Sequence, residues 1–369
     1  MNSANKDQKL LVRLVLTGLL LTIVVIGLGA YARLTDAGLG CPDWPTCYGL
    51  IDVPRTAAQI SAAEQAFPER PVEPIKAWNE MIHRYFAGAL GILIAIIALV
   101  SIKARRSMNS TVKLPLLLPL LILAVVTFQA ALGMWTVTLK LMPIVVMGHL
   151  LGGFTTLCLL FLLYLRLKIS EQTQFSPKSI SHQSRSKRVS HEPAKKYVNF
   201  GLIGIVILTA QIALGGWTSS NYAAMSCIEF PVCQGDWQSH LTFDNSFDLL
   251  PPQKDSYEFG YLTHEERLTI HVTHRLGAMI TAAFIAWLAI LIFIRSHHGK
   301  LKNSINLKKY ALLMFTLLLI QLGLGISNIW FSLPLSVAVA HNVVAALLML
   351  SLIAITYKLQ QNTRELHYE

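Results

Sequence analysis

Eight blocks of apolar residues recur along the chain, and each is about as long as the roughly twenty residues that cross a bilayer core. They lie near residues 11–31, 84–103, 115–138, 144–166, 197–217, 272–295, 308–330 and 334–357. The composition agrees, since 53% of the 369 residues are hydrophobic and 14% are charged, against about a quarter charged in an ordinary soluble domain. The blocks predict an all-α integral membrane protein with eight transmembrane helices and no large soluble domain.

The formal net charge of +11 is compatible with nucleic-acid binding, but the distribution of the charges indicates a membrane instead. Lys and Arg gather before span one and between spans two and three, four and five, and six and seven, which all fall on one side. Because positive charge is retained on the cytoplasmic side, this pattern predicts that both termini are cytoplasmic. The lipid bilayer is therefore the expected partner, and nucleic acid is not.

The chain reads as two related halves of four spans each. Matching features follow in the same order in both halves: Gly29 and Gly215 before Cys-x5-Cys pairs, His83-Arg84 and His274-Arg275, Gln129–Gly133 and Gln321–Gly325, and His149 and His341. Each half has an even number of spans, so both cross the membrane in the same direction. We expect two pseudo-symmetric four-helix bundles, residues 1–167 and 197–369, joined by a basic cytoplasmic linker over 168–196.

Four histidines lie inside the predicted spans: His83, His149, His274 and His341. An ionisable group in hydrocarbon is costly and needs a partner or a function. All four fall in the first turns of even-numbered spans, so they lie toward the outer face, and the two in each half could face one another. Facing neutral imidazoles suit haem iron, whereas zinc requires three or four ligands. The alternative is that each histidine bonds a carbonyl on a neighbouring helix.

Charged residues beside these histidines differ between the halves. Glu80 precedes His83 by three residues and shares its helix face, whereas His271 holds the equivalent position before His274. Glu80 could move protons, orient the histidine or sense substrate charge, or be a solvated acid at a helix start. We expect His271 to be interfacial. Arg84 and Arg275 could pair with haem propionates or extend to the interface.

These residues together resemble the haem A synthase family, in particular its bacterial branch with cysteine pairs in the outer loops. The resemblance covers nearly the whole chain and is carried by an ordered set of motifs: ARLTDAGLGCPDWPTC at 32–47, Glu80-x-x-His83-Arg84, Gly148-His149, His274-Arg275 and His341-Asn342. It implies a membrane-bound oxidoreductase of the bacterial inner membrane. Such enzymes oxidise the methyl group at carbon 8 of haem O to a formyl group, giving haem A for terminal oxidases.

The resemblance also assigns the two halves. It implies that His274 and His341 hold a haem b, which relays electrons, and that His83 and His149 receive haem O, with Glu80 beside that substrate. In this interpretation haem is both cofactor and substrate, and the protein positions it and tunes it. Haem O synthase is the expected source of the substrate, and the electron donor is not identified by the sequence.

The cysteine pairs look like the loop cysteines of the family. A five-residue gap can close as a small disulfide loop, Cys41–Cys47 in the first outer loop and Cys227–Cys233 in the third. An oxidising outer compartment favours these disulfides, and metal capture or free thiols are the alternatives. Cys158, inside span four, is expected to be a packing residue.

Two other functions are compatible with part of this pattern. A cytochrome b-like electron-transfer subunit would also use four histidines for two haems, but a pure relay has no need for the difference between Glu80 and His271. A transporter can contain parallel repeats, but the histidine pairs do not favour it.

Overall fold

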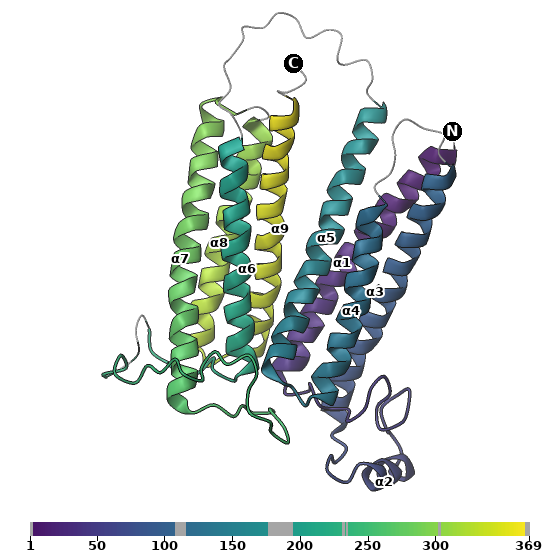
Figure 1. The fold of residues 1–369 in the computed structure, drawn as a ribbon, viewed down its shortest axis with the longest axis vertical. Coiled ribbons are helices and arrows are strands. Elements are labelled where there is room, and N and C mark those ends of the chain that lie inside the picture. Colours follow the sequence, from purple (N-terminus) through teal and green to yellow (C-terminus); the bar gives the residue numbers. More distant parts are fainter. Residues whose placement is uncertain are drawn as a thin grey trace, which may run out of the picture.

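The computed structural model describes residues 3–107, 116–175, 195–230, 233, 235–301 and 304–365. These residues form nine α-helices and no strand, and eight of the helices are long and apolar enough to cross a membrane (Figure 1). The eight are α1 (Ser3–Leu34), α3 (Pro74–Ser107), α4 (Leu117–Thr138), α5 (Pro143–Phe175), α6 (Lys195–Ser220), α7 (His264–His297), α8 (Ser304–Trp330) and α9 (Leu335–Glu365). The predicted fold class, an all-α protein with eight spans, is confirmed.

The contacts between helices form two closed rings. In one, α1 contacts α3 and α5, and α4 completes the ring between them; in the other, α6 contacts α7 and α9, and α8 completes the ring. The rings lie side by side (Figure 1) and meet where α1 and α5 contact α9 and where α5 contacts α6. A single apolar core runs through both and includes Val15, Leu160, Ile285 and Leu352. Burial of these side chains holds the rings together.

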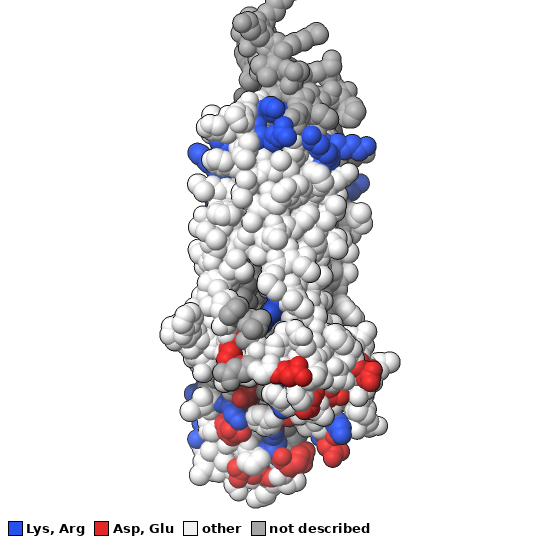
Figure 2. Space-filling view, turned by 90° about the vertical axis from the view of Figure 1, so that its left-hand side faces the viewer, with Lys and Arg blue, Asp and Glu red and all other residues white. Residues whose placement is uncertain are grey.

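The start of α1 and the end of α9 lie at one end of the rings, and the long connections α1–α3 and α6–α7 lie at the other (Figure 1). We call the second end the loop face; it consists of residues 35–73, 139–142, 221–263 and 331–334. In the view of Figure 2, a band of Lys and Arg lies near the end that carries the termini, and the Asp and Glu residues gather at the loop face. The segregation of charge expected from the sequence is therefore present in three dimensions.

Several helices are longer than the apolar blocks that predicted them. α3 begins at Pro74 and α7 at His264, well before the expected starts near 84 and 272. Thr263 starts α7 with a capping box, in which its side chain accepts from the Glu266 N–H and Glu266 accepts from the Thr263 N–H. Hydropathy misses such polar first turns, so Glu80 and His271 lie within helices rather than at their starts.

The connection between the two halves is shorter than the expected linker over 168–196. α5 continues to Phe175 and α6 begins at Lys195. Residues 176–194 lie outside the described residues.

Two disulfides close the loops of the loop face. Cys41 is bonded to Cys47 and Cys227 to Cys233, each at an S–S distance of 2.05 Å, and Cys158 is a free thiol in α5. The predicted pairing is confirmed. The first loop also contains the short helix α2 (Ala57–Ala66), which the sequence analysis did not expect because a short polar helix leaves no apolar block.

Candidate functional site

His83 on α3 and His149 on α5 face each other across the middle of the first ring. The centres of their imidazole rings are 6.3 Å apart, although α3 and α5 do not contact one another within the described part of the chain. Both side chains are partly buried, and the Nδ1 atom of each is buried without a hydrogen-bond partner. The predicted meeting of this pair across one bundle is therefore observed.

The spacing of this pair fits a single iron atom between the two rings. A metal–imidazole bond is about 2 Å long and the bonded nitrogen lies about 1 Å from the ring centre, so two axial imidazoles have centres about 6 Å apart. A buried nitrogen without a partner is costly to maintain, and a ligand between the rings gives these imidazoles a role. The residues present therefore fit a haem with two axial histidines.

The second ring carries its two histidines on α7 and α9. His274 and His341 project from helices that also lie diagonally across their ring. His149 and His341 occupy the same turn of their helices, because α5 begins at Pro143 and α9 at Leu335, one residue after Pro334. The additional residue between Pro334 and His341 therefore does not shift His341 along its helix, because Pro334 lies before the start of α9.

Each of the four imidazoles lies against a glycine of the preceding membrane-spanning helix: His83 on Gly29, His149 on Gly133, His274 on Gly215 and His341 on Gly325. A Cβ atom at these glycines would stand 2.9–3.2 Å from the ring Cε1 atom, inside the usual contact distance of about 3.5–4.0 Å. Glycine therefore lets the Cε1 edge of each ring approach the neighbouring helix closely.

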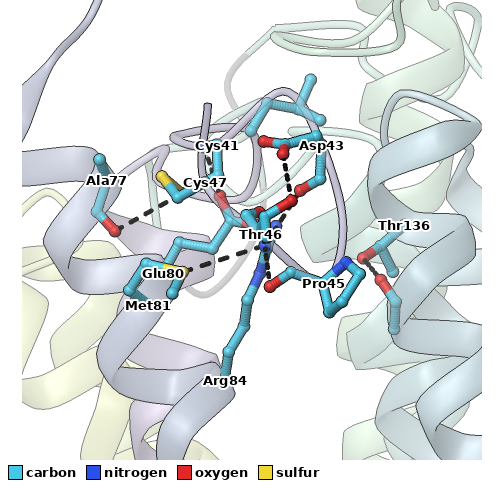
Figure 3. A network of polar contacts seen from close by, with 12 residues as sticks. Cys41, Asp43, Pro45, Thr46, Cys47, Ala77, Glu80, Met81, Arg84 and Thr136 are labelled. Atoms are coloured by element: carbon cyan, nitrogen blue, oxygen red, sulfur yellow. Dashed lines mark hydrogen bonds and ion pairs between the residues drawn. A yellow bond between two sulfur atoms is a disulfide. The ribbon is translucent and has the colours of Figure 1, made fainter. Parts of the chain in front are cut away.

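Glu80 is a buried carboxylate beside the first pair, with only 6% of its surface exposed. Its Oε2 atom accepts from the Cys41 N–H at 2.8 Å, and its Oε1 atom accepts from Arg84 Nη2 at 2.5 Å (Figure 3). A solvated acid at a helix start, one of the alternatives left open by the sequence, is therefore wrong. Glu80 connects the disulfide loop to the helix that carries His83.

Arg84 and Arg275 have corresponding partners in the two halves. Arg84 donates to the carbonyls of Asp43 and Thr46 at 3.0 and 2.7 Å, inside the loop closed by the first disulfide (Figure 3). Arg275 donates to the carbonyls of Cys227 and Glu229 at 2.5 and 2.9 Å. Both guanidinium groups therefore hold a disulfide loop against its helix, a role that the sequence did not suggest. Their contact with haem propionates stays a prediction.

His271 differs from its expected interfacial position. It is 4% exposed, and its Nε2 atom accepts from Arg275 Nε at 3.3 Å. α7 begins seven residues earlier, at His264, so His271 lies within the packed part of the helix. It thus takes the place of Glu80 as the neighbour of the arginine. His240 and His264 are exposed.

The first disulfide loop is packed as well as bonded. Tyr48 is buried among Cys41, Cys47, Val53 and neighbouring apolar residues, and its hydroxyl group donates to the Pro71 carbonyl at 3.0 Å. Burial raises the pKa of the Tyr48 phenol to about 12. The loop above the first histidine pair is therefore an ordered cover with a neutral tyrosine at its centre.

Eight apolar helices, with one facing pair of imidazoles in the first ring and a histidine on each of two diagonal helices in the second, define a multi-pass membrane protein. The chain belongs to the COX15-CtaA family of cytochrome oxidase assembly proteins, whose model matches residues 12–353. The resemblance on which the sequence analysis relied is thereby confirmed.

Curated relatives of the chain cover nearly its whole length. It is 46% identical to the heme A synthase of Shewanella oneidensis over 341 residues, which are 92% of this chain and 93% of that protein. It is 26% identical to the heme A synthase of Mesorhizobium japonicum and 23% identical to that of Bacillus licheniformis. These matches cover 88% and 89% of this chain and 83% and 88% of those proteins, respectively.

Proposed function

We infer that this protein is a haem A synthase, a membrane enzyme that oxidises the carbon 8 methyl group of haem O to the formyl group of haem A. The observation that carries this proposal is the facing pair His83 and His149 beside the buried Glu80. The 46% identity to a heme A synthase over 92% of the chain supports it.

The two rings have different roles in this proposal, and we regard them as pseudo-symmetric domains over 1–167 and 197–369. The first ring receives haem O between His83 and His149, and the second holds haem b between His274 and His341. The difference in charge supports this direction, because the first pair has a buried carboxylate, Glu80, three residues before its histidine, whereas His271 holds that position in the second. Bound haem supplies the redox chemistry at both sites.

The side chains of the protein then position the substrate, exclude water from it and handle protons. His83 and His149 would hold the haem between them and so fix its orientation. Glu80 is the acid–base group nearest this pair in sequence, and its bonds to Arg84 and to the Cys41 N–H hold it in place. The disulfide loop, held by Arg84, covers the site and keeps bulk water away from the reacting carbon.

The direction of insertion follows from the charges. Lys and Arg near the ends of α3, α5 and α7, and near the starts of α6 and α8, lie on the side of the termini, so we place that side in the cytoplasm of a bacterial cell and the loop face outside the inner membrane. The disulfides are compatible with an oxidising outer side. Haem O handed over by haem O synthase and an unidentified electron donor complete the set of partners.

Extraction of pigments from cells that express the protein together with haem O synthase tests this proposal. We expect haem A in the extract, and its loss in His83→Ala and Glu80→Ala variants that still insert into the membrane. Bound haem b without haem A would instead indicate a cytochrome b-like electron-transfer subunit. A protein that binds no haem would contradict both functions and favour a transporter.

A further inference from the structure

Arg84 and Arg275 have different neighbours one turn earlier on their helices. Glu80 lies four residues before Arg84 and forms an ion pair with it, so this part of the first ring carries one negative and one positive charge (Figure 3). His271 lies four residues before Arg275 and accepts from its Nε atom at 3.3 Å. The same helix position therefore holds a carboxylate in one ring and an imidazole in the other.

The hydrogen bond from Arg275 shows that His271 is a neutral imidazole. A ring nitrogen that accepts a hydrogen bond carries no proton, so the proton of His271 is on Nδ1. A doubly protonated ring would instead point an N–H at the guanidinium group, which has only donors. The side chain is 4% exposed, and its Nδ1 atom is buried without a partner among the described residues. His271 therefore adds no charge that offsets Arg275.

Other acids do not remove this difference between the rings. Each disulfide loop carries one acid at the matching place, two residues after its first cysteine: Asp43 and Glu229. On α7 the acid nearest the histidine is Glu266, which stands eight residues earlier, about 12 Å along the helix, in the capping box. On α3 it is Glu80, which stands three residues earlier, about 4.5 Å along the helix. A carboxylate on the histidine's own helix is thus much closer to it in the first ring.

The residues of the second ring fit a haem beside this arginine. His274 and His341 come from diagonal helices, and each lies on a glycine whose added Cβ atom would stand 3.1 or 3.2 Å from the ring. The Nδ1 atom of His341 is buried without a partner among the described residues. Position 271 is one turn from His274, about 5–6 Å away between Cβ atoms, and Arg275 follows that histidine directly. Charges at both positions therefore lie close to a metal bound there.

Nearby charge changes how easily a bound haem is reduced. An added electron is stabilised by a positive charge and destabilised by a negative charge, and the interaction is stronger in an apolar environment than in water. A carboxylate at position 271 would offset the charge of Arg275, as Glu80 offsets that of Arg84. The neutral imidazole leaves the positive charge in place, which favours the reduced haem.

We propose that His271 raises the reduction potential of the haem in the second ring, because it leaves the positive charge of Arg275 without a carboxylate on the preceding turn. This inference rests on the proposed function, in which the second ring holds a haem that relays electrons. A raised potential keeps an electron on that haem once it has arrived. The second ring therefore serves as the electron store of the enzyme.

Spectroelectrochemical titration of the full-length, haem-loaded protein measures this effect at about pH 8, where a carboxylate beside a guanidinium group is ionised. The component that disappears in His274→Ala identifies the haem of the second ring. His271→Glu copies the charge pair of the first ring, and His271→Gln is its neutral control. We expect the equilibrium constant for reduction to fall about tenfold in His271→Glu relative to His271→Gln, or about 59 mV for one electron. Equal potentials in these two variants would overturn the proposal.

The reciprocal change removes the carboxylate from the first ring. In Glu80→Gln the charge of Arg84 is no longer offset, so the equilibrium constant for reduction of a haem in the first ring should rise about tenfold. The potential of the second ring should stay unchanged. Glu73→Gln, at an exposed acid paired with Lys76, is the control. An unmoved potential of the first ring in Glu80→Gln would show that this helix position does not control reduction, and would overturn the proposal even if His271→Glu does not insert.

The failure of this inference differs from the failure of the proposed function. A protein whose haem potential follows the charge at position 271 but that forms no haem A keeps the role of His271 and loses the synthase activity. A protein that forms haem A but has equal potentials in His271→Glu and His271→Gln keeps the activity and loses the role of His271.

Discussion

Arg70 in the first loop forms a two-pronged ion pair with Glu258 in the loop between α6 and α7. The Nη1–Oε2 distance is 2.7 Å and the Nη2–Oε1 distance is 2.9 Å, and Arg70 Nε also donates to the Leu39 carbonyl at 2.8 Å. The hydrogen bond to Glu258 raises the pKa of Arg70. This contact joins the two loops that cover the two rings.

Removal of this ion pair should loosen the loop face. Glu258 is 8% exposed and Arg70 25% exposed in their side chains, so Arg70→Met leaves a nearly buried carboxylate unpaired. We expect the free energy that stabilises the folded loop to fall by about 1–3 kcal/mol, between the values for exposed and buried ion pairs. Limited proteolysis of residues 221–263 should therefore become faster. Arg55→Met, which breaks the exposed pair with Asp52, is the control. Equal proteolysis of the two variants would contradict a joining role for Arg70.

The glycines that contact the four imidazoles should tolerate no side chain. In Gly325→Ala, the new methyl group would stand 3.2 Å from the His341 ring, and such overpacking costs about 1–3 kcal/mol. We expect about tenfold weaker retention of haem in the second ring, seen as loss of its low-spin absorption. Gly323→Ala on the same helix meets no atom within 4 Å and should retain the absorption. The same loss in both variants would indicate a general effect on α8.

Glu80→Gln tests the buried charge without changing the shape of the side chain. The substitution leaves Arg84 without its carboxylate partner in a buried position, and we expect the yield of haem A to fall at least about tenfold. The haem b absorption of the second ring should remain, because its histidines lie on α7 and α9. Glu73→Gln, at an exposed acid paired with Lys76, is the control. Haem A at the wild-type level in Glu80→Gln would exclude a role for the charge.

The sequence predicted the spans, the disulfides and the presence of four histidines inside the spans, because each depends on a local pattern. The length of each apolar block matches the bilayer core, and a Cys-x5-Cys disulfide closes a short loop however the rest of the chain folds. The helix starts were less well predicted, since the first turns of α3 and α7 are polar and hydropathy does not detect them. The misplacement of His271 follows from that error.

The partners of Arg84 and Arg275 could not be read from the sequence. Their contacts join residues about 40 to 50 positions apart, and a carbonyl acceptor has no residue-type signature. Gln129 and Gln321 were visible in the sequence only as repeat markers. The structure shows that Gln129 donates to the His149 carbonyl and that Gln321 contacts the His341 ring.

The assignment of one ring to cofactor and the other to substrate is the central claim, and spectra of two purified variants test it most directly. His274→Ala should lose the bis-histidine haem b absorption. His83→Ala should keep that absorption and form no haem A when it is expressed with haem O synthase. Survival of the haem b spectrum in His274→Ala, or its loss in His83→Ala, would contradict the assignment of the two rings.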